Sequence, residues 1–265
     1  MIDQKTLEAA RLWCKTGADW VDKGAHSTGV RYLDQAIAVF EEVGDLSWLT
    51  YARHQKLQAL KSRDAHEDAE AMSLDVLRGY ALLEDAYGKA LALSHSAESV
   101  ARLGRRDAAM ARLNLAVTVA ERAGHPGLQA YVLMQCGHLF LEAGNDLQAI
   151  RLYRAAEAVY QRQGMDDDAA KSRYAAGEVL ARLGERAEAI ALLEDVQSHF
   201  FGQKQYRDAL KPLSLLLHLY EQAGLWDDKN RVGELIHFCG QYIIQGEGES
   251  EAKPAPSPPP RARRA

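Results

Sequence analysis

Three consecutive carboxylates, Asp166, Asp167 and Asp168, form a run that could bind a cation. Carboxylate oxygens are the ligands that hard cations such as Mg²⁺ and Ca²⁺ prefer. The run also begins two residues after Gly164, at a place where a helix could begin. Acidic groups in a first helical turn cap free amides and interact favourably with the helix dipole. We therefore expect the run to open a helix, and we predict no metal site.

Cysteine chemistry is not indicated by the number or the spacing of the thiols. The three cysteines, Cys14, Cys136 and Cys239, are odd in number and far apart, unlike a disulfide framework or a paired-cysteine zinc site. Cys136 stands at a core position of its expected helix, which favours packing over a role as a nucleophile. We expect buried free thiols.

Sequence motifs of common enzyme classes are missing from the chain. It contains no glycine-rich phosphate loop ending in Gly-Lys-Ser/Thr, no His-Glu-x-x-His and no Gly-x-Ser-x-Gly. We predict that the protein is not an enzyme and that it needs no cofactor.

Composition favours a globular protein. The chain has 265 residues, of which 47% are apolar, and its formal charge of −5 comes from 37 acidic and 32 basic residues that are interspersed. Without a basic region, neither nucleic acid nor an anionic membrane is an expected partner. The first residues lack the basic and apolar segments of a signal peptide, and no apolar run approaches the length of a transmembrane helix. We expect a cytoplasmic protein.

Glycines recur with a period of 40 residues, which indicates an internal repeat. We call each series of glycines 40 residues apart a register. The first register skips position 64, which holds Asp64, and a second register follows 20 residues after members of the first. The period therefore contains two helical halves, and the chain holds six copies before Gly246. We predict about twelve helices and negligible strand. Helix breaks are expected near Gly24, Gly44, Gly104, Gly124, Gly144, Gly164, Gly184 and Gly224.

The spacing of small and bulky residues within each copy resembles the tetratricopeptide repeat family. Gly137, Phe140, Ala149, Tyr153 and Ala156 stand at the spacing of that pattern, and the resemblance covers roughly residues 3 to 245. The common repeat of the family has about 34 residues. The longer period here is similar to that of several bacterial regulators and cytoskeletal adaptors. The resemblance implies an all-α, right-handed α-solenoid of about six helix-turn-helix repeats over residues 1–246.

The resemblance also implies a concave groove that the first helix of each pair lines. Columns of residues 40 positions apart then face this groove, and their aromatic, methionine and charged side chains suit a protein or peptide partner. An ordinary solvated groove with scattered apolar residues is the alternative. The predicted groove residues are Tyr51, His54, Tyr131, Met134, His138, Lys171, Tyr174, Lys211 and His218.

One of these columns alternates Glu98, His138, Glu178 and His218, which suggests a metal site. Neighbouring repeats are offset by about 10 Å or more, whereas zinc ligands lie about 2 Å from the ion. We therefore predict no metal there. The family's basic clamp for an acidic C-terminus is not expected either, because the first columns hold Cys14 and Ala18 in place of the required Lys and Asn.

These observations favour a protein–protein interaction scaffold or adaptor that binds a protein or peptide in the groove. The alternative is a peptide-sensing regulatory protein whose superhelix responds to a small ligand. Similar bacterial regulators often carry a further DNA-binding or enzymatic domain, for which this chain has no room.

The last expected helix, 227–245, has an apolar arc that Phe238 and Tyr242 widen beyond that of a one-sided surface helix. We predict a homodimer through this C-terminal repeat, since a symmetric contact would cover the extra face. The alternatives are that second helices of this family are simply wide-faced, or that prolines of the tail pack on these two rings.

Residues 247–265 form a tail rich in proline and arginine, and it holds five of the seven prolines. We predict that it is disordered. Its prolines and the following Arg261, Arg263 and Arg264 could form a polyproline ligand with a basic flank, or they could be a solvated terminus without function.

Overall fold

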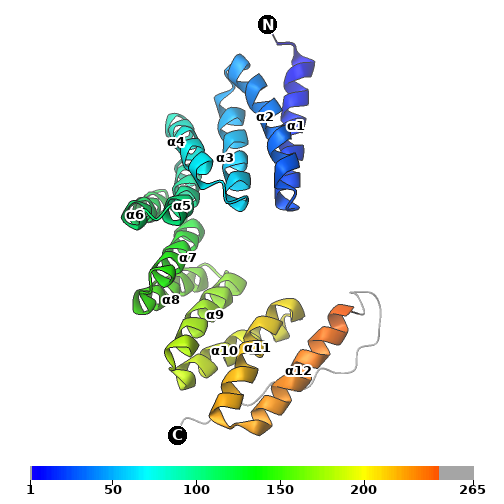
Figure 1. The fold of residues 1–265 in the computed structure, drawn as a ribbon, viewed down its shortest axis with the longest axis vertical. Coiled ribbons are helices and arrows are strands. Elements are labelled where there is room, and N and C mark those ends of the chain that lie inside the picture. Colours follow the sequence, from blue (N-terminus) through cyan, green and yellow to red (C-terminus); the bar gives the residue numbers. More distant parts are fainter. Residues whose placement is uncertain (1, 245–265) are drawn as a thin grey trace. The chain divides into compact units, whose positions relative to one another are not determined.

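The computed structural model describes residues 2–244, and this part of the chain forms twelve α-helices without a β-strand (Figure 1). The prediction of an all-α fold with about twelve helices is confirmed for these residues. In chain order the helices are α1 (Gln4–Asp22), α2 (His26–Val43), α3 (Leu46–Ser62), α4 (His66–Leu82), α5 (Ala86–Arg102), α6 (Arg106–Arg122), α7 (Pro126–Glu142), α8 (Asp146–Arg162), α9 (Asp166–Leu183), α10 (Arg186–Gly202), α11 (Tyr206–Ala223) and α12 (Trp226–Ile244).

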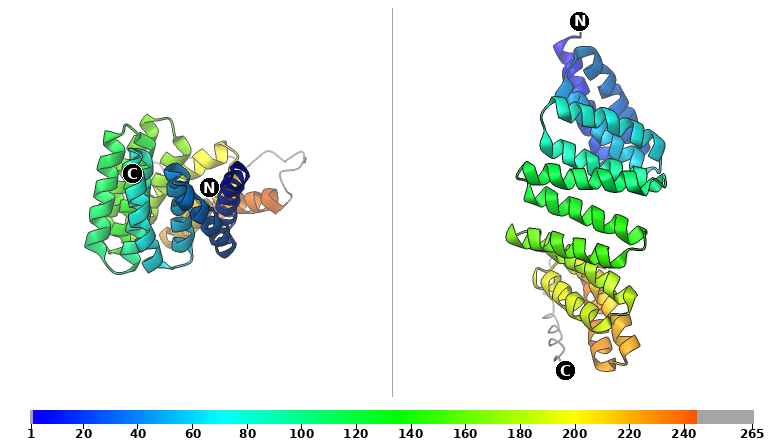
Figure 2. Two further views of the ribbon diagram at one scale, coloured as in Figure 1. Left: turned by 90° about the horizontal axis from the view of Figure 1, so that it is seen from above. Right: turned by 90° about the vertical axis from the view of Figure 1, so that its left-hand side faces the viewer.

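Consecutive helices pack on one another within two compact units. Unit 1 is Met1–Leu139, and unit 2 begins at Phe140. In unit 1 the consecutive helices from α1 to α6 pack on one another (Figure 2). In addition, α1 contacts α3 and α3 contacts α5. In unit 2 the same holds from α8 to α12, and α9 also contacts α11. Contact with the next helix and the next but one is the stacking expected of an α-solenoid of two-helix repeats.

Helices end where the backbone enters the left-handed region, as the glycine registers predict. At Gly44 φ is 76°, and the amides of Gly44 and Asp45 return to the carbonyl of Phe40 at 2.9 and 3.1 Å. These bonds satisfy a carbonyl that the end of α2 leaves open. All eight predicted breaks are confirmed by positive φ at Gly24, Gly44, Gly104, Gly124, Gly144, Gly164, Gly184 and Gly224.

The same turn also forms without glycine. Asp64, Glu84 and Lys204 have φ of 57°, 54° and 59°. The skipped position of the first register, 64, therefore ends α3 as a glycine would. A left-handed conformation is unfavourable for residues with a side chain, so the surrounding helix packing must hold these three turns in place.

Close approach of α1 and α2 depends on two glycines. A Cβ atom at Gly29 would lie 2.6 Å from Cγ2 of Val21 and 2.8 Å from the carbonyl oxygen of Gly17. Beside this contact, Leu33 and Phe40 are fully buried. The small residues thus let the two backbones meet while large side chains fill the space next to them.

The three cysteines are buried free thiols, as the sequence predicts. Burial raises the pKa of Cys14 and of Cys136 to about 12 and that of Cys239 to about 11. Such thiols are poor nucleophiles because the thiolate is the reactive form. The predictions for the tail, 247–265, fall outside the described residues.

Candidate functional site

An aromatic side chain at the start of α3 organises the candidate site of unit 1. Asp45 caps α3 by accepting a hydrogen bond from the amide of Trp48 at 3.2 Å. The Trp48 ring stacks on buried Phe40 with centroids 5.9 Å apart, and it meets the edge of Tyr51 at 6.0 Å. Tyr51 itself keeps 40% of its surface exposed. Packing therefore fixes Trp48 from below and leaves Tyr51 open to solvent.

Two cations of α1 lie over the same tryptophan. Cζ of Arg11 is 5.8 Å and Nζ of Lys15 is 6.0 Å from the centroid of the Trp48 ring. Arg11 also pairs with Asp45 at 3.5 Å. In the described part of the chain, Lys15 has no carboxylate within ion-pair distance. Its ammonium group is therefore available to a ligand.

A cavity of about 250 Å³ opens between these residues, lined by Lys15, Ser47, Trp48 and Tyr51. Loss of hydration raises the pKa of Tyr51, and the neighbouring Cys14, Asp22 and Asp19 raise it further. The Tyr51 hydroxyl is thus protonated at neutral pH and can donate a hydrogen bond. We call this cavity and its four lining residues the Trp48 site. Sequence reasoning named only Tyr51 of this set.

The other predicted groove residues of unit 1 differ in exposure. His138 is exposed, while Tyr131 and Met134 are half-buried. Burial raises the pKa of Tyr131, and Glu98 and Tyr87 raise it further. These three side chains are all at least partly accessible, and their role in binding stays a prediction.

His54 is an exception, and its assignment to the groove surface is wrong. It is 3% exposed, with Nδ1 2.8 Å from the Tyr80 hydroxyl and Nε2 3.0 Å from Nδ1 of His95. Its ring points into the core between α3, α4 and α5. Burial chiefly lowers its pKa to about 4, helped by Lys61 and opposed by Asp85. A neutral ring with two buried partners is a structural element of the core, since both ring nitrogens are satisfied there.

The predicted residues of unit 2 are mostly at the surface. Lys171, Lys211 and His218 are exposed, and Tyr174 is half-buried. Nζ of Lys171 lies 3.2 Å from Asp168, and His218 contacts Gln222 at 2.7 Å. Burial raises the pKa of Tyr174, with a smaller effect of Glu178. The structure therefore leaves all four accessible, and their binding role remains a prediction.

The three carboxylates at 166–168 open α9, which begins at Asp166 as expected. No side chain caps this helix at Met165, however. Asp167 accepts instead from Gln205 at 2.8 Å and contacts Nε2 of His199 at 2.7 Å. Both contacts lower the pKa of Asp167, and the hydrogen bond from Gln205 has the larger effect. Within residues 2–244 no group of three or more His, Cys, Asp and Glu is arranged to hold a metal ion.

Four aromatic rings gather where α10, α11 and α12 meet, and we call them the C-terminal aromatic cluster. It consists of Phe201, Tyr206, Phe238 and Tyr242. Tyr206 is at its centre, with ring centroids 5.2 Å from Phe201, 5.4 Å from Phe238 and 4.5 Å from Tyr242. The chain's own rings thus cover part of the face that the sequence assigned to a dimer, and the homodimer stays a prediction.

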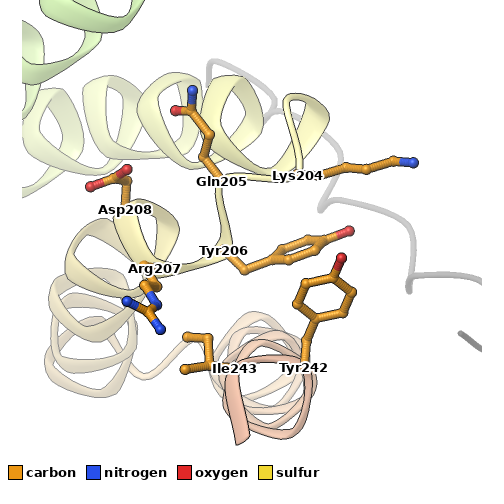
Figure 3. Close-up of a pocket in the computed structure, with 7 residues that line it drawn as sticks. All are labelled: Lys204, Gln205, Tyr206, Arg207, Asp208, Tyr242 and Ile243. Atoms are coloured by element: carbon orange, nitrogen blue, oxygen red, sulfur yellow. The ribbon is translucent and has the colours of Figure 1, made fainter. Parts of the chain in front are cut away.

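A second cavity, of about 450 Å³, opens beside this cluster (Figure 3). Sequence reasoning missed Tyr206, which begins α11 two residues after the left-handed turn at Lys204. The lining residues are Lys204, Gln205, Tyr206, Arg207, Asp208, Tyr242 and Ile243.

None of the helices in the described residues is both long and apolar enough to cross a membrane.

Comparison with known proteins defines the fold class. No family model matches the chain, and no curated protein matches its sequence. Solved structures that are similar over most of the chain include the following three, each with low sequence identity. BtubC (BKLC) from P. vanneervenii is 15% identical, with a TM-score of 0.65 over 97% of this chain and 99% of that one. Nearly identical TPR-like repeats of a putative kinesin light chain from Podosopora anserina are 14% identical, with a TM-score of 0.62 over 77% and 100%.

The third structure is a Rap protein complexed with Competence and Sporulation Factor. It is 17% identical, with a TM-score of 0.59 over 83% of this chain and 66% of that one. At such low identity the similarity concerns the fold alone. The chain has the fold of the tetratricopeptide-repeat proteins, and the resemblance found in its sequence is confirmed.

Proposed function

We propose that the protein is an interaction scaffold or adaptor that binds a peptide segment of a partner protein at the Trp48 site. The observation that carries the proposal is the open cavity between Trp48, Tyr51 and Lys15. These residues belong to α1 and α3, each of which is the first helix of its two-helix repeat. The Trp48 ring is held in position by buried Phe40, and it contacts the exposed Tyr51 ring in turn. Tryptophan and tyrosine in such positions contribute most to binding at protein interfaces.

The polar groups of the site suit a peptide ligand. The Lys15 ammonium is available, and both it and the Tyr51 hydroxyl can donate hydrogen bonds to carbonyl or carboxylate oxygens of a bound chain. Tyr51 loses little conformational entropy on binding, because it has few rotatable bonds. Binding would therefore combine burial of aromatic surface with directed hydrogen bonds.

Capture from native lysate tests this proposal. Full-length tagged wild type, Tyr51→Ala and Leu74→Ala are compared. Leu74→Ala is the control, because Leu74 is an exposed residue of α4, the second helix of its repeat, and its removal leaves the Trp48 site intact. A protein partner that wild type and Leu74→Ala retain and that Tyr51→Ala loses supports the proposal. Retention of the same partner by all three proteins would contradict it.

A peptide-sensing regulatory protein is the second candidate function. Similarity of the fold to a Rap protein that was solved in complex with Competence and Sporulation Factor favours it. Native mass spectrometry of the purified chain distinguishes the two candidates. A small peptide that co-purifies and is lost in Tyr51→Ala supports the sensor, whereas a protein partner without such a peptide supports the scaffold. The cytoplasmic location and the absence of catalysis also remain proposals, supported by sequence composition and the missing motifs.

A further inference from the structure

The cavity beside the C-terminal aromatic cluster presents two tyrosine hydroxyls on one side. Tyr206 stands at the start of α11 and Tyr242 in the last turn of α12, with their rings at 64° to each other. Figure 3 shows the two side chains running at an angle to each other, Tyr206 from α11 and Tyr242 from α12, with their hydroxyl ends near one another in this view. Tyr206 is 8% exposed, so packing fixes the position of its ring beside the open cavity.

Most polar groups of this cavity are hydrogen-bond donors. Among the described residues, neither the Tyr206 nor the Tyr242 hydroxyl has a hydrogen-bond partner. Burial raises the pKa of Tyr206, which keeps its hydroxyl protonated. Lys204 and Arg207 add cationic donors to the lining, while the carboxylate of Asp208 points away from Tyr242 (Figure 3). A ligand rich in acceptors and poor in donors would match this set.

We propose that this cavity binds a proline-rich segment of a partner protein, whose rings contact Tyr206 and Tyr242 and whose carbonyl oxygens accept hydrogen bonds from the two hydroxyls. Proline has no amide N–H, and a polyproline helix makes no internal hydrogen bonds, so its carbonyl oxygens are free acceptors. A helical ligand satisfies most of its carbonyls internally. Aromatic-lined surfaces are the usual recognition sites of proline-rich segments.

This site is independent of the proposed function at the Trp48 site. The two cavities belong to different units and share no residue. Loss of binding at one therefore has no bearing on the other, and the tests use different variants.

Titration of the full-length chain with a synthetic oligoproline peptide, blocked at both ends, tests the proposal. Tyr206→Phe and Tyr242→Phe remove a hydroxyl and keep the ring, and Tyr87→Phe is the matched control at an exposed tyrosine of unit 1. We expect each of the first two to weaken binding about fivefold, as for the loss of one hydrogen bond, and the control to bind as wild type does. Absence of binding to the wild type, or equal affinity of all four proteins, would overturn the proposal.

Two further titrations distinguish a partner's proline-rich segment from other occupants of the cavity. An oligoglutamate peptide that binds as tightly as oligoproline would show that Lys204 and Arg207 select the ligand, which overturns the proposal. The chain also carries prolines of its own at 258–260, outside the described residues. If replacing these three by alanine leaves the affinity for oligoproline unchanged, a partner's segment is supported. A gain of about tenfold or more, about 1.4 kcal/mol, would mean that the chain's own prolines compete for the cavity, and would overturn the choice of a partner.

Discussion

Nε2 of His54 lies 3.0 Å from Nδ1 of His95 in the buried core of unit 1, where the Tyr80 hydroxyl occupies the other ring nitrogen of His54. Two imidazoles in such contact cannot both be charged without repulsion and loss of hydration. Burial chiefly lowers the pKa of both rings, that of His54 to about 4 and that of His95 well below its usual value, and Lys61 lowers both further. The core therefore holds them neutral.

Acid should destabilise unit 1 through this pair. In the unfolded chain both rings bind protons with the ordinary pKa of 6.5, whereas in the folded chain they stay neutral to lower pH. Above pH 6.5 both states are neutral, so the pair does not reduce the free energy of unfolding there. Stability should be lost progressively as the pH falls from about 6.5 towards 4, by on the order of 3 kcal/mol for His54. Urea unfolding at several pH values measures this loss. His54→Leu/His95→Leu should flatten the dependence, and an unchanged slope in that variant would contradict the assignment.

Close packing of α1 on α2 should make Gly29 intolerant of a side chain. Gly29→Ala places a Cβ 2.8 Å from a backbone oxygen, which cannot move without displacing α1. We expect a cost of about 1–3 kcal/mol in the free energy of unfolding. Gly233→Ala is the matched control, because its Cβ meets no atom of the described residues within 4 Å and alanine should stabilise α12 by about 0.5–1 kcal/mol. Thermal unfolding that shifts equally in both variants would contradict this account of the packing.

Unit 2 contains a buried carboxylate that depends on one hydroxyl. Tyr220 donates a hydrogen bond to Oε1 of Glu194 at 2.6 Å, and both side chains are buried. Tyr220→Phe should destabilise the protein by about 1.5–3 kcal/mol, since it leaves a buried charged acceptor without its donor. Chemical denaturation of this variant and of Tyr174→Phe gives the comparison, because half-buried Tyr174 has no such partner among residues 2–244. Equal stabilities of the two variants would speak against the proposed role of Tyr220.

The homodimer through Phe238 and Tyr242 is tested by light scattering. The C-terminal aromatic cluster already supplies intramolecular neighbours for both rings. If a second copy nevertheless covers this face, the wild type is dimeric and Phe238→Glu/Tyr242→Glu dissociates it, because buried charges disfavour the interface. A monomeric wild type would contradict the predicted dimer. A dimer that persists in the double variant would show that the two copies meet through another surface.

The repeat architecture could be predicted because its signal is local. Positive φ at a helix end favours glycine strongly, so the 40-residue registers mark the breaks without any knowledge of packing. Asp64, Glu84 and Lys204 carry no such signal, yet tertiary contacts enforce the same turn there. The period of the repeat pointed to position 64, where residue type did not, whereas the turns at Glu84 and Lys204 were not predicted.

The candidate sites were predicted less well, because they depend on side-chain direction and on partners distant in sequence. His54 shares a 40-residue column with accessible Met134, but Tyr80 and His95, 26 and 41 residues away, draw its ring into the core. Of the Trp48 site only Tyr51 belongs to a 40-residue column, and Lys15, Ser47 and Trp48 were not predicted because they stand outside these columns. The spacing of Arg11 and Lys15, one helical turn apart, was the available signal.

The affinity of the purified full-length chain for its captured partner tests the central claim most directly. Calorimetric titration with wild type, Tyr51→Ala and Leu74→Ala gives three dissociation constants under one condition. Because Tyr51 is an exposed aromatic residue of the Trp48 site, its removal should weaken binding at least about tenfold, by roughly 1.4 kcal/mol or more. Leu74→Ala should bind as the wild type does. Equal dissociation constants for Tyr51→Ala and wild type, with both proteins folded, would contradict the assignment of partner binding to the Trp48 site.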